Sequence, residues 1–147
     1  MGNVVVTGLG FISSIGNDCG AVVDSLQNLR HGFEPYTEGE GDPSLPKLYG
    51  SIKGFNTLGN DTEAWTYPEK YRFTRLQLKT MSPHVMYAHC ALLDALTDAG
   101  LTAADISNPR TGLYSASAGS PVQQYEQLRI MNSRGVMRCS PFGIVTA

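Results

Sequence analysis

The side chains best suited to nucleophilic or metal chemistry are three cysteines and three histidines. His84, His89 and Cys90 fall within one predicted helix. On a helix, the separation between the two histidines turns their side chains about 140° apart, so they do not converge on one metal ion. Zinc usually takes four ligands, and no carboxylate or second cysteine is spaced to complete such a set. Core packing is the favoured interpretation, and no metal site is predicted.

The cysteines are weak candidates for a catalytic nucleophile. Cys19, Cys90 and Cys139 are far apart, and none shows the pairing with a base that activates a nucleophile. The G-x-S-x-G motif of serine hydrolases is absent as well. An odd number of widely spaced cysteines fits free thiols in a reducing compartment, which predicts a cytoplasmic protein. No residue of this chain is predicted to be catalytic.

A glycine-rich turn follows the first apolar run. Gly8-Leu9-Gly10 lies between a predicted strand and a predicted helix, where dinucleotide-binding loops occur. The G-x-G-x-x-G fingerprint needs a third glycine where this chain has Ser13, and the acidic ribose-binding residue is missing. The favoured interpretation is a tight strand-to-loop turn with no cofactor. A free-standing nucleotide-binding domain remains a minor alternative.

Composition excludes several classes of protein. The chain has 147 residues, which suits one domain in the usual range of about 100–200 residues. Charged residues make up only 16%, against a usual share of about 25%, which suggests that another structure covers part of the surface. The net charge of −2 argues against nucleic-acid binding. No apolar run approaches the roughly 20 residues of a membrane span.

The charges are unevenly distributed. Residues 69–79 and 129–138 each have a net charge of +3, so the rest of the chain is strongly acidic. Basic segments of this kind can steer an acidic partner towards a protein. Solvated helix faces are the commoner explanation, and the charges alone leave both interpretations open.

The chain is predicted to open strand–loop–helix. The β-branched run at residues 3–7 predicts a buried parallel strand. Asn17-Asp18 predicts the start of a helix that stops at Gly32. Residues 33–68 are rich in Gly and Pro and are predicted to be irregular, with a short strand at 48–53.

Helices dominate the next part of the prediction. A basic helix or turn is expected at residues 69–80. Ser82-Pro83 predicts the start of a helix that runs to Ala99 and stops at Gly100. This helix is apolar on nearly all sides, so it should be buried by more structure than this chain supplies.

The last part of the chain is predicted to add a strand and a helix. A second buried strand is expected at 111–117, followed by a helix from Ser120-Pro121 to Asn132 that Gly135 ends. The alternation of strands and helices predicts an α/β fold with a mostly parallel sheet and packed helices.

A series of short motifs runs along nearly the whole chain. It begins with VVVTGLG, from Val4 to Gly10, and Ile15-Gly-Asn17. It continues with Met81-Ser82, Asp98-Ala-Gly-Leu101, Gly112-Leu-Tyr-Ser-Ala-Ser117, Arg134-Gly-Val136 and Ser140-Pro-Phe142. In this order, the motifs resemble the N-terminal part of the β-ketoacyl-acyl-carrier-protein synthases.

This resemblance implies a thiolase-like α/β fold, built from two similar halves in a homodimer. Residues 1–147 then form the N-terminal part of one half and end before the segment with the catalytic cysteine. The implied reaction is a decarboxylative Claisen condensation in fatty-acid or polyketide-type synthesis. In the family a cysteine takes the acyl chain and two histidines act on the malonyl thioester. No cysteine or histidine here matches them, so the chain alone is predicted to be inactive.

The resemblance also implies an acyl pocket. In the family it is lined by residues that follow the second strand and the Ser-Pro-Phe motif. The residues in those places are Gly119, Phe142 and Gly143. The two glycines predict a wide pocket, unless they serve only backbone turns.

A docking site for the acidic acyl carrier protein is implied as well. Family members bind this carrier of phosphopantetheine thioesters through basic residues. Those in matching places here are Lys79, Arg134 and Arg138, and Arg75 is nearby. They belong to the two basic segments, which favours docking over solvated helix faces. The main alternative is a non-catalytic partner subunit that sets chain length, since such subunits resemble ketosynthases but lack the cysteine.

Overall fold

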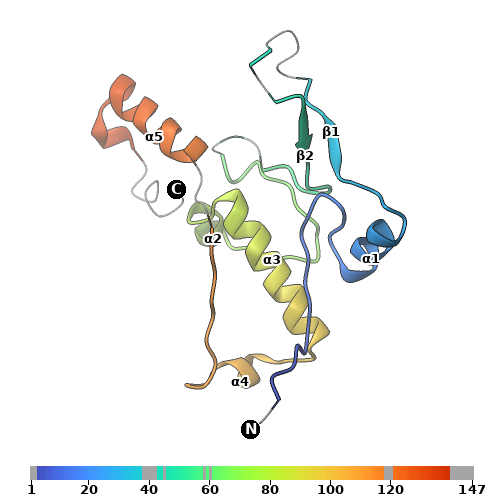
Figure 1. Cartoon of the computed structure of the whole chain (residues 1–147). Coiled ribbons are helices and arrows are strands. Elements are labelled where there is room, and N and C mark those ends of the chain that lie inside the picture. The colour runs from blue at the N-terminus through green and yellow to red at the C-terminus, as the bar shows by residue number, and fades with distance from the viewer. Residues whose placement is uncertain are drawn as a thin grey trace. The chain divides into compact units, whose positions relative to one another are not determined.

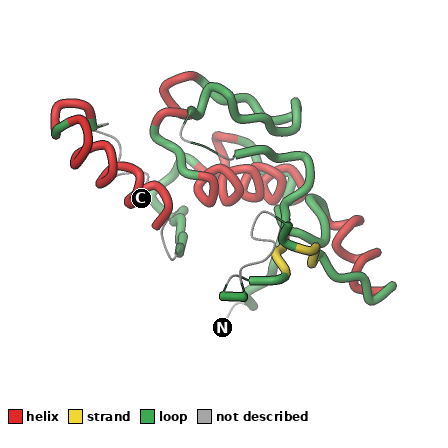
Figure 2. The backbone as a smooth tube through the Cα atoms, turned by 90° about the horizontal axis from the view of Figure 1, so that it is seen from above, coloured by secondary structure: helices red, strands yellow, loops and turns green. Residues whose placement is uncertain are grey.

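The structure is a computed structural model, shown in Figure 1. It describes residues 3–37, 43–44, 46–57, 59, 61–117 and 121–139. The chain forms two compact units. The first consists of residues 1–54 and 90–108, and the second of residues 55–89 and 109–147. Helices and loops make up nearly all of the described backbone, as Figure 2 shows.

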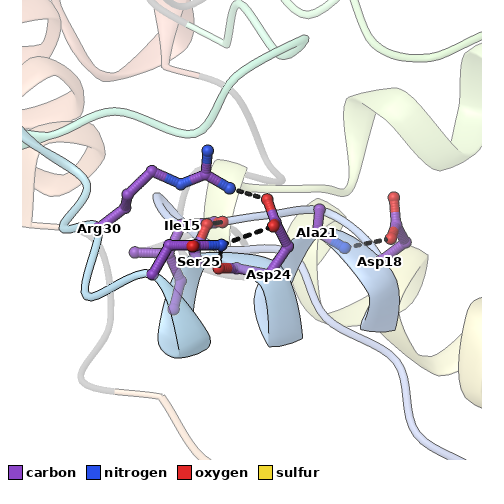
Figure 3. Close-up of polar contacts among 7 residues, drawn as sticks. Ile15, Asp18, Ala21, Asp24, Ser25 and Arg30 are labelled. Carbon is purple, nitrogen blue, oxygen red and sulfur yellow. Dashed lines mark hydrogen bonds and ion pairs between the residues drawn. The ribbon is translucent and has the colours of Figure 1, made fainter.

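In the first unit, helix α1 (Cys19–Gln27) is attached to its own neighbours in sequence (Figure 3). The buried Ser25 hydroxyl donates a hydrogen bond to the Ile15 carbonyl at 2.7 Å, which holds the preceding loop against the helix. On the exposed side, Asp24 forms an ion pair with Arg30. The short segment around α1 therefore has its own set of polar contacts.

The predicted start of α1 is confirmed, and its predicted end is wrong. The Asp18 carboxylate caps the first turn by accepting a backbone N–H at 2.8 Å. The helix ends at Gln27 because Leu29 turns the chain with a positive φ of 53°. Gly32 is not the stop. It lies against Ser14, where a Cβ would collide with that side chain.

The predicted buried strand at residues 3–7 is not seen. These residues pair with no other strand in the part of the chain that the structure describes. Val4, Val5 and Val6 are 101%, 71% and 79% exposed. A strand needs hydrogen bonds to a neighbouring strand, so a β-branched run alone does not form one.

The one sheet within the described residues is a pair of short antiparallel strands. Strand β1 (Phe33–Pro35) pairs with β2 (Leu48–Gly50), with Glu34 opposite Tyr49. The predicted strand at 48–53 is therefore confirmed in a shorter form. The mostly parallel sheet that the sequence predicted is not found in the part of the chain that the structure describes.

The second unit has an aromatic core. The Phe55 ring lies 6.2 Å from Tyr71 and 5.3 Å from Tyr87, measured between ring centroids. Tyr71 is 3% and Trp65 is 5% exposed. The Tyr87 hydroxyl is 2.6 Å from Thr57 Oγ1, which gives this ring a polar partner at its tip.

Helix α3 (Pro83–Asp98) follows Ser82 as predicted, and Gly100 follows its end with a φ of +67°. Met86 and Cys90 are completely buried. Most of its other side chains are only half-buried by the described residues. The prediction that further structure covers this helix therefore stays a prediction.

A short helix, α4 (Ala103–Ile106), follows α3. Its start is capped by Asp105, whose carboxylate accepts hydrogen bonds from the Thr102 hydroxyl and N–H. The hydrogen bond from the Thr102 side chain lowers the pKa of Asp105, and that from the Thr102 backbone lowers it further. Residues 111–117 are extended and exposed, so the second predicted strand is not seen either.

Helix α5 (Pro121–Arg134) confirms the prediction of a helix after Ser120-Pro121. Gly135 breaks it with a φ of 83°, also as predicted, and a single 3-10 turn, η1 (Val136–Arg138), follows. This turn contacts α5.

Candidate functional site

The predicted acyl-pocket residues Gly119, Phe142 and Gly143 lie outside the described residues. The pocket therefore stays a prediction. The predicted docking residues are all described, and all four belong to the second unit. They are Arg75, Lys79, Arg134 and Arg138.

The first pair of docking residues is presented by helix α2 (Arg75–Lys79). Thr74 and Gln77 form a reciprocal capping box at its start, so this very short helix has a defined N-terminus. Leu78 is 9% exposed and anchors the helix to its unit. With Leu78 turned inward, Arg75 and Lys79 are exposed to solvent.

The two basic residues of α2 differ in their partners. Arg75 Nε donates to Glu63 Oε1 at 2.6 Å, and this acidic residue offsets its charge. Lys79 lies in the last turn, where a cation is favoured by the helix dipole. It has no ion-pair partner among the described residues.

The second pair of docking residues lies at the end of α5. Arg134 occupies its last turn, Gly135 redirects the backbone, and Arg138 lies in η1. Both arginines are exposed. Neither has an ion-pair partner in the parts of the chain that the structure describes.

One arginine of the same segment is neutralised. Arg129 binds Glu126 through two hydrogen bonds of 2.7 and 2.5 Å. The hydrogen bond from Arg129 lowers the pKa of Glu126, and the positive charges of Arg129 and Arg134 lower it further. The same contact raises the pKa of Arg129. In the segment 129–138, Arg134 and Arg138 therefore remain without an ion-pair partner among the described residues.

The structure does not merge the two basic segments into one site. Among the described elements, α2 and α5 make no contact with each other. An acidic partner would meet Lys79 as one point of charge and the Arg134–Arg138 pair as another. The sequence reasoning missed the compensation of Arg75, because Glu63 is distant from it in the chain.

The glycine-rich turn is explained by close packing in the first unit. A Cβ on Gly8 would collide with the backbone of Ala95, and one on Gly10 with that of Ala91. Both contacts lie on α3, so glycine is needed for close approach to this helix. This agrees with a structural reason for the glycines, although the neighbouring helix was not foreseen.

Leu9, the residue between these glycines, has hydrogen-bond partners for both its backbone N–H and its backbone carbonyl. Leu9 N–H donates to the Asp98 carboxylate at 2.9 Å. The Cys19 thiol lies 3.7 Å from the Leu9 carbonyl, as a weak hydrogen-bond donor. Leu9 thus links the end of α3 to the start of α1. This contact was not predicted, because Asp98 and Leu9 are far apart in the sequence.

The histidines and cysteines have structural surroundings. Cys90 is completely buried, and the His89 ring packs 5.5 Å from the Phe73 ring. The His84 ring nitrogens lie 3.0 and 3.1 Å from the hydroxyl of the buried Ser82. The core interpretation is confirmed for Cys90, whereas His84 and His89 are half-buried. Within the described residues, no group of three or more potential metal ligands comes together.

Comparison with known families finds a match over the whole chain. The family description "Beta-ketoacyl synthase, N-terminal domain" matches residues 1–147. The chain therefore belongs to the β-ketoacyl synthase family.

Several curated relatives have names of this class. The chain is 31% identical over 146 residues to 3-oxoacyl-[acyl-carrier-protein] synthase 1 of Haemophilus influenzae, covering 98% of this chain and 33% of the relative. It is 31% identical over 150 residues to the Escherichia coli K12 synthase 1, covering 100% and 34%. A Synechocystis synthase 2 is 29% identical over 142 residues, covering 96% and 31%. The chain thus spans about a third of the length of these relatives.

The family implies a thiolase-like fold, of which the described residues show a small α/β portion. None of the described helices has the length and apolar character needed to cross a membrane.

Proposed function

We propose that this chain is the N-terminal part of a β-ketoacyl-acyl-carrier-protein synthase. The observation that supports this best is the family match over residues 1–147, together with relatives named as 3-oxoacyl-acyl-carrier-protein synthases. The proposed protein acts in fatty-acid or polyketide-type synthesis in the cytoplasm, as a homodimer.

The proposed reaction joins an acyl thioester to malonyl-carrier protein. A catalytic cysteine thiolate first accepts the acyl group and releases the carrier thiol. The malonyl group then loses CO2, and the resulting carbanion attacks the acyl thioester. A carbon–carbon bond forms and the cysteine leaves as thiolate. Oxyanion stabilisation is required at both thioester steps.

In our proposal, residues 1–147 contain none of the residues that carry out this condensation. Cys90 is completely buried within α3, and Cys19 and Cys139 are half-buried beside backbone carbonyls. The Cys19 thiol lies 3.7 Å from the Leu9 carbonyl, and the Cys139 thiol lies 3.7 Å from the Gln127 carbonyl. The stretch instead supplies framework and binding surface, and residues 1–147 alone are inactive.

The test of this proposal is a condensation assay on the full-length protein. With an acyl donor and malonyl-carrier protein, we expect release of CO2 together with a β-ketoacyl product. A full-length protein that binds the acyl carrier protein but forms no such product would favour the non-catalytic chain-length subunit. A full-length protein with neither property would contradict the proposal.

The proposed docking partner is the acidic acyl carrier protein. Lys79, Arg134 and Arg138 support this role because they are exposed and have no ion-pair partner among the described residues. Arg75 is the weaker member of the set because Glu63 offsets it. Attraction between exposed charges is screened by salt, so affinity should fall as ionic strength rises.

Charge reversal tests the docking surface. In the full-length protein, the double variant Lys79→Glu and Arg138→Glu should bind the carrier protein about tenfold or more weakly at low salt. Lys47→Glu, a basic residue outside both segments, is the matched control and should leave the affinity nearly unchanged. Equal affinity for the double variant and the wild type would refute this assignment.

The proposed acyl pocket rests on Gly119, Gly143 and Phe142. A glycine leaves room for the acyl chain that a bulky side chain would fill. We therefore propose a wide pocket. Replacing Gly119 by Ile in the full-length protein should shorten the longest acyl chain that is extended. An unchanged product distribution would contradict the role of this glycine.

A further inference from the structure

The turn η1 is a fixed feature at the end of α5. Gly135 N–H donates to the Met131 carbonyl at 3.0 Å, and Cys139 N–H donates to the Val136 carbonyl at 3.0 Å. The Cys139 thiol also lies 3.7 Å from the Gln127 carbonyl of α5. The conformation of η1 therefore depends on its backbone hydrogen bonds and on Cys139. The side chain of Met137, in the middle of this turn, is free to face outward.

The apolar side chains of η1 are exposed. Val136 is 69% and Met137 is 96% exposed. Single apolar residues are normal on protein surfaces, so exposure alone indicates no binding site. Methionine is nevertheless a flexible apolar residue that adapts to different partner surfaces.

The charges around these side chains provide the second observation. Val136 and Met137 stand between Arg134 and Arg138 in the sequence, and these arginines have no ion-pair partner among the described residues. Arg129, nearer the middle of α5, is instead bound to Glu126. The apolar residues and the unpaired cations thus coincide in η1 and the last turn of α5.

This combination is typical of a protein-binding point. Interface cores are enriched in methionine and arginine and depleted in lysine and acidic residues, with a polar rim around an apolar centre. A small apolar centre between two arginines is complementary to an acidic surface that presents an apolar side chain of its own. A purely electrostatic site would have no use for an exposed methionine at its centre.

We propose that Val136 and Met137 form the apolar centre of a docking point flanked by Arg134 and Arg138. Its occupant is an acidic protein surface with an exposed apolar side chain. This inference rests on the proposed function, in which that occupant is the acyl carrier protein. It adds that the arginines attract the partner over distance, while Met137 contributes a contact that salt does not screen.

The test uses the full-length protein, apo-acyl carrier protein, and binding measured at low and high salt. Met137→Gln keeps the length of the side chain and removes its apolar character. We expect it to weaken binding about fivefold at both salt concentrations, since the lost contact is apolar. Arg138→Gln should weaken binding mainly at low salt and flatten the salt dependence. Leu48→Gln, an exposed apolar position in β2, is the matched control and should bind as the wild type does.

The outcomes separate this inference from the proposed function. If Arg138→Gln weakens binding and Met137→Gln does not, the apolar centre is wrong and carrier-protein docking stands. If neither variant weakens binding, docking at η1 is wrong as well. As a measurement that needs no substitution, the methyl NMR signal of Met137 should shift on addition of carrier protein. An unshifted signal at saturation would also overturn the proposal.

Discussion

Helix α1 and the β-branched run at residues 3–7 lie in the same unit but differ in how their structure is determined. Helix α1 is capped by Asp18, and Ser25 holds the preceding loop to it. Residues 3–7 include three exposed valines and have no strand partner among the described residues.

The difference follows from where each element finds its hydrogen bonds. A helix closes its backbone hydrogen bonds within its own sequence, and caps satisfy its ends. A strand finds its partners elsewhere in the chain or in another chain. Directly after the run at 3–7, Gly8-Leu9-Gly10 packs on α3. The contrast predicts that damage to this attachment is costly, whereas damage within α1 is local.

The largest effect is expected at Gly10. Gly10→Val adds a side chain where a Cβ already collides with the Ala91 carbonyl on α3. We expect the free energy of unfolding to fall by about 3 kcal/mol, measured by urea unfolding of the full-length protein. Gly20→Ala in α1 is the control and should change stability by less than about 1 kcal/mol, because its Cβ would meet only Asp18 Oδ1 at 3.3 Å. Similar losses for both variants would remove the distinction between the two regions.

The next effect is expected at Asp98. Asp98→Ala leaves the Leu9 N–H without its acceptor, and we expect a loss of about 1–2 kcal/mol. Asp98→Asn keeps an acceptor oxygen and should lose less. Hydrogen exchange at the Leu9 amide measures the contact directly. Equal exchange rates in Asp98→Ala and in the wild type would show that the hydrogen bond does not hold this turn.

A smaller, local effect is expected in α1. Ser25→Ala removes the hydroxyl that binds the Ile15 carbonyl, at a cost of about 1 kcal/mol. The faster hydrogen exchange should stay within residues 13–27. If it extends to Leu9, the two regions are coupled and α1 is not an independent element.

The smallest effect is expected for the Glu126–Arg129 ion pair of α5, whose contribution depends on pH. The pKa of Glu126 is lowered in the folded protein, chiefly by its hydrogen bond from Arg129. The support that this pair gives α5 is therefore present above the unfolded pKa and is lost as the pH falls through the lower folded pKa. NMR titration should place the Glu126 midpoint below the ordinary pKa of a glutamate and move it upward in Arg129→Ala. An unchanged midpoint in that variant would contradict the assigned cause.

Local signals in the sequence predicted the helix starts well. Asp18 before α1, Ser82-Pro83 before α3 and Ser120-Pro121 before α5 all mark real helices. The predicted stop at Gly32 was wrong, and the true end at Gln27 was missed, because a left-handed conformation at Leu29 is not expected from its residue type. Strand β1 was missed because three residues that include a proline give almost no strand signal.

The candidate site was predicted only in part, for the same physical reason. Exposure of Lys79, Arg134 and Arg138 follows from their charge and their place in basic segments. Compensation of Arg75 by Glu63, and the contact between Asp98 and Leu9, depend on residues brought together by folding. Family resemblance supplied what periodicity did not, namely that this chain is one part of a larger fold.

That claim is tested most directly by hydrogen exchange at the amides of Val4, Val5 and Val6 in the full-length protein. If residues 3–7 form a strand whose partners lie outside the described residues, these amides should be protected about a thousandfold or more, to the level of a core strand. Exchange at the rate of an unstructured chain, with α1 still protected, would contradict the account.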